Sequence, residues 1–252
     1  MKFINRILFA ASSVICVSAL MLGCKPEAQV PESAGSIAFI HASPGSPGVE
    51  ALIDNRIVSQ GRINYLQSSV ASPGQPQIYV PIRTGNREIR ISPDSGRTTV
   101  FNANLNVETG RIYTAIAYDT LNGGRIRGVV LNDDLTLPTT GNTRVRFLHL
   151  APNAPTVDVT LLRTSATPND SVTISGRSFI GANPNAGQLS TFISVPGGTY
   201  TARVKLAGTQ TVVASVPLTA ANTSLAAGRI VTLFATGTAR SLPLALGGAR
   251  NF

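Results

Sequence analysis

The sequence is poor in the residues that build covalent and metal-bound frameworks. Its 252 residues include two cysteines, two histidines and no tryptophan. Two cysteines cannot form a network of disulfides, so packing must stabilise a folded body. Two histidines far apart in the chain form no metal-binding cluster. Charged residues make up 13% of the chain, which is too little for a disordered polyelectrolyte.

Turn-forming residues and arginine are abundant instead. The chain has 23 glycines, 16 prolines and 43% hydrophobic residues, a composition typical of many turns and short extended segments. The formal net charge is +9, carried mainly by arginine. Such a charge favours anionic partners, or it reflects a solvated surface decorated with arginine. The composition leaves both interpretations open.

The N-terminal segment "MKFINRILFAASSVICVSALMLGC" has the features of an export signal. Two cations, Lys2 and Arg6, precede an apolar run from Ile7 to Leu22 that is short for a membrane span. It resembles a bacterial lipoprotein signal, in which a small residue precedes a lipidated cysteine. We expect residues 1–23 to be a cleaved signal peptide and Cys24 to carry lipid. Residues 24–35 are then a flexible tether rich in proline, glutamate and alanine.

One phrase occurs twice. "HASPGSPGVEA" begins at His41 and "HLAPNAPTVDV" begins at His149. Two later blocks repeat in the same order: "YVPIRTGNREIRI" resembles "SVPGGTYTARVKL", and "VETGRIYTAIAYDT" resembles "LAAGRIVTLFATGT". Three ordered matches predict a duplication, with modules at 36–132 and 143–252 and a linker at 133–142. A stretch near 163–176 is expected to hold a loop insertion.

Within each copy the hydrophobic period is two. In "RVRFLHL", Val145, Phe147 and His149 share one face, and Arg144 and Arg146 share the other. Helix periods with caps are missing after the leader. We therefore predict an all-β protein with two tandem immunoglobulin-like antiparallel β-sandwich domains after a cleaved lipoprotein signal.

The histidine phrase and the later "GRI" strand resemble a bacterial surface domain family. That family opens with H-A-S-P-x-x-P-x-V-D and is known as a domain of unknown function. Its members are typically secreted or lipid-anchored, often with tandem copies. The two matches span about Ser36 to Leu242. The chain departs from the pattern at Glu50, Leu150 and Ala151. The resemblance implies a fold and an exported location, and it supplies no activity.

The histidine phrase has a structural and a functional interpretation. Each histidine falls on the inward face at a strand end, where a buried imidazole can bond backbone groups freed by a proline turn. This assigns a structural motif to His41, Pro44, Pro47, His149, Pro152 and Pro155. The alternatives are a metal site with Glu50 or Asp158, and a nucleophile at Ser43. Ser43 has Ala151 as its counterpart, so the catalytic alternative would serve one half only.

Other polar groups suggest a second candidate site. Arg87, Arg90, Arg125 and Arg127 could line one exposed face and bind an anionic polysaccharide. Asp133 and Asp134 are expected in a solvated linker. We predict no nucleic-acid partner, because the chain is expected to be exported and its basic clusters lack aromatic platforms. The sequence predicts no cofactor and no metal.

Together these features predict a non-catalytic, lipid-anchored cell-envelope protein at the outer membrane. Its tandem modules are expected to act in surface structure, adhesion or partner binding. The alternative is a binding protein for an anionic polysaccharide. The expected partners are the membrane, through the N-terminal lipid, and a surface protein or an anionic glycan.

Overall fold

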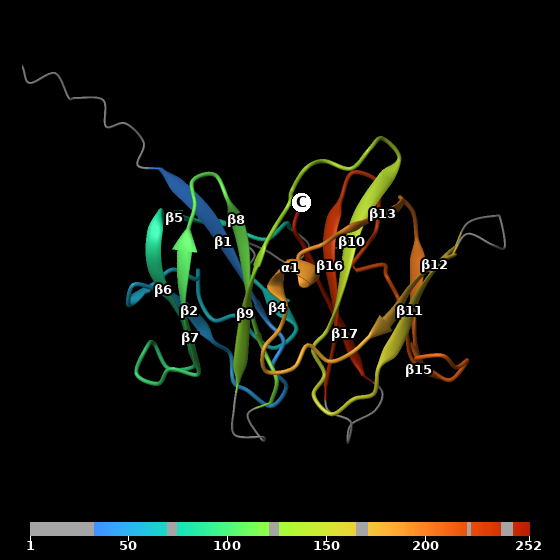
Figure 1. Ribbon diagram of the computed structural model, residues 1–252, viewed down its shortest axis with the longest axis horizontal. Helices are drawn as coiled ribbons and strands as arrows, with labels where there is room; N and C mark the ends of the chain where they lie inside the picture. The colour runs from blue at the N-terminus through green and yellow to red at the C-terminus, as the bar shows by residue number, and fades with distance from the viewer. Residues whose placement is uncertain (1–32, 70–74, 121–125, 165–170, 221–222, 238–243) are drawn as a thin grey trace, which may run out of the picture. The chain divides into compact units, whose positions relative to one another are not determined.

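The computed structural model describes residues 33–69, 75–120, 126–164, 171–220, 223–237 and 244–252. The predicted signal peptide, Cys24, most of the predicted tether and Arg125 lie outside these residues. Nearly all regular structure is β-strand (Figure 1). No helix among the described residues is long and apolar enough to cross a membrane.

The strands of the first half are β1 (Ala34–His41), β2 (Glu50–Ile53), β3 (Arg56–Ile57), β4 (Gln67–Ser68), β5 (Val80–Arg83), β6 (Gly85–Ser92), β7 (Phe101–Val107), β8 (Ile112–Tyr118) and β9 (Arg127–Asn132). They form two sheets. The outer sheet has the order β3-β2-β6-β7 and is antiparallel throughout. The inner sheet has the order β4-β1-β8-β9, and β5 also pairs with β1.

The second half has the same arrangement, except that its described residues contain no counterpart of β4, because β13 pairs with β10 as β5 pairs with β1. Its strands are β10 (Asn142–His149), β11 (Val157–Arg163), β12 (Ser171–Arg177), β13 (Ile193–Pro196), β14 (Tyr200–Leu206), β15 (Val212–Pro217), β16 (Ile230–Thr236) and β17 (Ala245–Arg250). The outer sheet is β12-β11-β14-β15 and the inner sheet is β13-β10-β16-β17. The prediction of an all-β protein is therefore confirmed. It needs one correction, because not all neighbouring strands are antiparallel. In each inner sheet the central pair, β1 with β8 and β10 with β16, is parallel.

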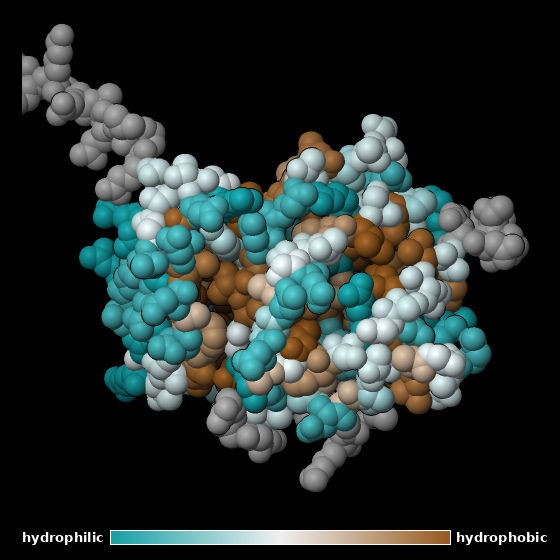
Figure 2. All heavy atoms as spheres, viewed as in Figure 1, coloured by the Kyte–Doolittle hydropathy of each residue, from teal (hydrophilic) through white to brown (hydrophobic). Residues whose placement is uncertain are grey.

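The parallel pairs follow from the path of the chain. Parallel neighbours cannot be joined by a tight hairpin and need a crossover connection. Between β1 and β8 the chain builds β2 and β3 in the outer sheet, returns to add β4 and β5 beside β1, and then builds β6 and β7 in the outer sheet. Figure 2 shows polar side chains over the outer sheet of the first half. Apolar side chains are visible at the open edge between its two sheets.

Each half has its own apolar core between its two sheets. In the first half Ile37, Phe39 and Ala115 pack against Ile89 and Ile91. In the second half the corresponding inner-sheet residues are Val145, Phe147 and Leu233, and they pack against outer-sheet residues such as Val159 and Val204. The alternation of buried residues along these strands produces this division between faces.

A third core lies between the two inner sheets. It contains Ile40, Ile116 and Leu131 of the first half with Leu148 and Phe234 of the second. Strand β16 is consequently buried at all seven positions, and β8 at six of seven. Residues 33–252 accordingly form one compact unit. The inner sheets are buried on both faces, which explains why "IYTAIAY" and "IVTLFAT" are apolar runs without alternation.

Several boundaries differ from the sequence-based expectation. Strand β1 already begins at Ala34, inside the predicted tether, and β10 begins at Asn142, inside the predicted linker. Part of the expected loop insertion near 163–176 is a strand, β12, which pairs with β11. A single helical turn, α1 (Ala186–Leu189), lies beside β9, where no helix was predicted. Short helical turns of this kind carry no periodic signal.

Candidate functional site

Both histidines lock a proline turn at the end of an inner-sheet strand. His41 is fully buried, and its Nε2 lies 3.1 Å from the carbonyl oxygen of Pro47. Because a carbonyl only accepts, Nε2 carries the proton and donates. Nδ1 then accepts the amide hydrogen of Ser43, at 3.4 Å. One imidazole thus bridges both ends of the turn.

His149 repeats this arrangement in the second half. Its Nε2 donates to the carbonyl oxygen of Pro155 at 3.0 Å, and its Nδ1 accepts from the amide of Ala151 at 3.3 Å. The residue after the first proline has a left-handed backbone in both copies, with φ of 74° at Gly45 and 58° at Asn153. Proline followed by glycine or asparagine is typical of a type II turn.

The histidines are held neutral. Burial lowers the pKa of His41 and of His149, and the hydrogen bonds to the proline carbonyls oppose that shift only in part. The backbone engages both nitrogens of each ring. Neither imidazole therefore offers a free lone pair to a metal or a substrate. Among the described residues no three histidine, cysteine, aspartate or glutamate side chains gather in a potential metal site.

The expectation that Asp133 is a solvated linker residue is wrong. Its side chain is completely buried, and its Oδ1 lies 2.8 Å from NH1 of Arg146, whose side chain is 1% exposed. The two atoms form an ion pair without hydrogen-bond alignment. Asp133 follows β9 of the first half, and Arg146 lies on β10 of the second. The ion pair therefore joins the two inner sheets.

Neutral groups complete a network around this ion pair. Tyr79 donates its hydroxyl to Oδ2 of Asp133 at 2.8 Å, and Thr114 donates to the same oxygen. Asn251 donates its Nδ2 to Oδ2 at 3.2 Å. Nε of Arg146 donates to Thr232 at 2.8 Å, and Thr232 donates to Oδ1 of Asn251 at 2.7 Å. The network thus closes on itself, linking residues of both halves.

Burial controls the ionisation of Tyr79 in this network. Desolvation raises the pKa of the Tyr79 phenol, and the adjacent charge of Asp133 raises it further. Tyr79 is therefore a hydrogen-bond donor at every pH the protein meets. The guanidinium of Arg146 also stacks over the ring of Phe192, 4.5 Å from its centroid.

The neighbouring Asp134 behaves as a surface group. Its side chain is 61% exposed and pairs with Arg144 at 2.8 Å. Hydrogen bonds from Arg144 and Thr136 lower its pKa well below the usual range for aspartate. The two adjacent carboxylates therefore have opposite environments, and sequence alone did not separate them.

The predicted anion-binding arginines do not form an uncommitted basic face in the described part of the chain. Arg87 donates to Asp54 at 3.2 Å and to the carbonyl oxygen of Thr84 at 2.6 Å. Arg90 is hydrogen-bonded to Thr99, Asn55 and the carbonyl oxygen of Gly96. Arg127 pairs with Asp119 at 2.8 Å and belongs to the other sheet. Arg125 lies outside the described residues.

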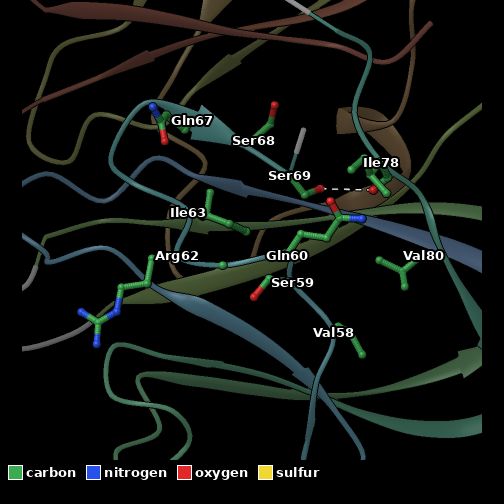
Figure 3. Close-up of a pocket in the computed structure, with 11 residues that line it drawn as sticks. Val58, Ser59, Gln60, Arg62, Ile63, Gln67, Ser68, Ser69, Ile78 and Val80 are labelled. Atoms are coloured by element: carbon green, nitrogen blue, oxygen red, sulfur yellow. Dashed lines mark hydrogen bonds between the residues drawn. The ribbon is translucent and has the colours of Figure 1, made fainter. Parts of the chain in front are cut away.

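Sequence reasoning missed two hollows at the open edges of the sandwiches. One, in the first half, has a volume of about 120 Å³ and is lined by side chains such as Val58, Ser69 and Val80 (Figure 3). The hydroxyl of Ser69 donates to the carbonyl oxygen of Ile78 there, and Arg62 extends away from the other lining side chains. The other hollow, of about 220 Å³, lies in the second half beside His149 and Arg177.

Comparisons with known proteins give a family and little more. No curated protein matches the sequence. A solved structure titled "The Bacillus anthracis TIE protein" is similar at 11% identity and a TM-score of 0.24, over 81% of this chain and 33% of that chain. The chain thus spans about a third of that structure, and similarity this low establishes no common function. Residues 35–160, half of the sequence, match a family described as "Domain of unknown function (DUF4397)". The chain belongs to the DUF4397 family.

Proposed function

We propose that this protein is a non-catalytic component of the bacterial cell envelope, anchored through lipid on Cys24 at the outer membrane. In this proposal its described part acts in surface structure, adhesion or partner binding. One observation carries the proposal: the two halves are joined by a buried core and a buried ion pair between Asp133 and Arg146. A body built in this way is suited to hold a binding surface at a fixed geometry.

The proposal includes a second copy of the family domain. The family match ends at residue 160, inside β11. The remaining chain supplies the strands that make the second half equivalent to the first, in the same order. The two histidine turns also have the same hydrogen bonds. We infer that residues 143–252 are this second copy.

A non-catalytic role is supported by the use of the histidines. Their ring nitrogens are occupied by backbone groups, so neither is placed to act as a general base. Ser43, the nearest hydroxyl to His41 in sequence, receives no hydrogen bond from the ring. Its amide donates to the ring instead.

The anchor is tested by replacing Cys24 with serine. Expressed in a bacterium that processes lipoproteins, the wild-type protein should fractionate with membranes, and Cys24→Ser should appear in the soluble fraction. A single acyl chain gives only marginal membrane binding, so a lipoprotein anchor needs more than one chain. Cys16→Ser is the matched control, because Cys16 lies within the predicted signal and should leave the fractionation unchanged. Membrane retention of Cys24→Ser after signal removal would contradict the anchor.

The alternative function, binding of an anionic polysaccharide, is favoured by one specific observation. The guanidinium of Arg177 borders the second-half cleft and has no carboxylate partner in the described residues. The arginines singled out from the sequence are not the ones that support this alternative.

A further inference from the structure

A cleft of about 220 Å³ opens between β12 and the α1 segment of the second half. Its lining includes Phe147, His149, Arg177, Ser178, Asn185 and Gln188. A smaller hollow of about 20 Å³ shares Phe147, Arg177 and Gln188 with the cleft. Arg146 lines this smaller hollow.

Arg177 differs from the other arginines near it. Arg144 and Arg146 each pair with an aspartate at 2.8 Å. Arg177 forms no ion pair within the described residues, and its Nε is buried without a hydrogen-bond acceptor. A buried donor of a charged group that has no acceptor destabilises the folded protein. A ligand acceptor would remove that cost.

Arg146 supplies a second unsatisfied donor at the smaller hollow. The residue is 2% exposed, its NH1 faces Asp133, and its NH2 has no hydrogen-bond partner. No acidic residue lines either hollow. The nearby carboxylate of Asp158 is engaged by the amides of Gly176 and Gly208, at 2.7 and 3.0 Å. Within the described residues, the lining of the cleft therefore has the positive charge of Arg177 and no acidic side chain.

The remaining polar lining suits hydroxyl groups. Asn185 uses its Oδ1 to accept from the amide of Gln188, and no bond from its Nδ2 is seen in the described part of the chain. The Gln188 side chain is exposed, and no bond to it is seen in the described residues. Ser178 shares a hydrogen bond with Thr156 at 2.9 Å. His149 is neutral here because burial lowers its pKa, so it adds no charge.

We propose that this cleft binds the carboxylate-bearing sugar of an acidic polysaccharide. The proposal deepens the alternative function above and rests on it. Arg177 would hold the carboxylate through its two-pronged guanidinium, a geometry that favours arginine over lysine. Gln188 and Asn185 would bond the sugar hydroxyls. The volume is below the roughly 300–1,000 Å³ of sites for drug-sized ligands, which suits a single sugar unit.

The test titrates the purified protein with glucuronate and with a short glucuronate-containing oligosaccharide, followed by amide chemical shifts. We expect saturable shifts at Ser178 and Gln188 that weaken as sodium chloride rises from about 50 to about 300 mM, over which the Debye length shortens from roughly 14 to roughly 6 Å. Glucose should give no shift. Arg177→Gln should weaken binding at least tenfold. The affinity of Arg177→Lys should lie between those of the wild type and Arg177→Gln.

Arg203→Gln is the matched control. Arg203 is exposed on β14 of the same outer sheet and does not line the cleft. Its replacement removes the same charge and should leave affinity unchanged. Arg177→Gln removes the unsatisfied Nε and breaks no ion pair within the described residues, so its Tm should not fall below the wild-type value, which separates lost binding from lost folding.

Four outcomes would overturn the proposal: no shift with either acid, equal affinity of Arg177→Gln and wild type, sulfate binding as tightly as glucuronate, or binding of an acidic peptide without binding of sugar acids. The last would point to a protein ligand. Oligosaccharide binding that Arg177→Gln leaves unchanged would refute this site alone, whereas no shift with either acid would also refute the alternative function. Neither result bears on the fractionation of Cys24→Ser, which tests the envelope proposal.

Discussion

Replacing Asp133 with alanine should destabilise the protein more than any surface charge substitution. The change leaves the guanidinium of Arg146 in a site where its side chain is 1% exposed and no carboxylate faces it. It also removes the acceptor used by Tyr79, Thr114 and Asn251. Breaking one side of a buried ion pair typically costs about 3–5 kcal/mol. That is a large share of the roughly 5–15 kcal/mol by which domains are stable.

Replacing Arg146 with methionine should destabilise the protein less than replacing Asp133 with alanine. In Arg146→Met the carboxylate of Asp133 keeps three donors, from Tyr79, Thr114 and Asn251. In Asp133→Ala the guanidinium keeps one hydrogen bond, to Thr232, and its contact with Phe192. We therefore expect the free energy of unfolding to be highest in the wild type, lower in Arg146→Met and lowest in Asp133→Ala. Urea denaturation of the purified variants measures this order.

The control is Glu108→Gln. Glu108 pairs with Arg111 at 3.1 Å, and both side chains are more than half exposed. Exposed pairs contribute about 0–1 kcal/mol, so the midpoint should hardly move. If Asp133→Ala lost no more stability than Glu108→Gln, the reasoning that the buried ion pair joins the inner sheets would be refuted.

Two further predictions concern the histidine turns. His41→Ala and His149→Ala should each lower the free energy of unfolding by roughly 1–3 kcal/mol, because Pro47 or Pro155 and a turn amide lose their partner; unchanged urea midpoints in both variants would count against the turn-locking role. Stability should also fall as pH drops below 6.5. Burial lowers the folded-state pKa of both histidines below that value, so the unfolded chain takes up protons first. Above pH 6.5 this contribution is fully present, and the double alanine variant should lose the pH dependence between about 6.5 and 5. A wild-type curve that is flat in this window would contradict the lowered pKa.

Much of the fold was predictable because apolar and polar residues alternate along the strands that have only one buried face. Val145 and Phe147 point into the second-half core, as their spacing indicates. The turn at each histidine was predictable from two prolines and a strand end. Both features depend on local residues and need no knowledge of distant partners.

The joining of the two halves was harder to predict. Arg146 lies on the face of β10 opposite to Val145, where an alternating pattern predicts exposure to solvent. That face is buried because the inner sheet of the first half packs against it. Asp133 follows β9 in a polar stretch, so burial depends on an arginine thirteen positions away on another strand. A signal was present in the unbroken apolar run of β16, which is typical of a strand buried on both faces. The sequence contained no signal for the cleft at Arg177, because the folded structure decides which arginines are paired with a carboxylate.

The most direct test of the account is calorimetric unfolding of the purified protein. Because the inner sheets share a core and an ion pair, we predict one transition whose calorimetric enthalpy equals its van't Hoff enthalpy. Asp133→Ala should lower that Tm or split the peak into two. Two separate transitions in the wild-type protein, left unchanged by Asp133→Ala, would show that the halves unfold independently and would contradict the account.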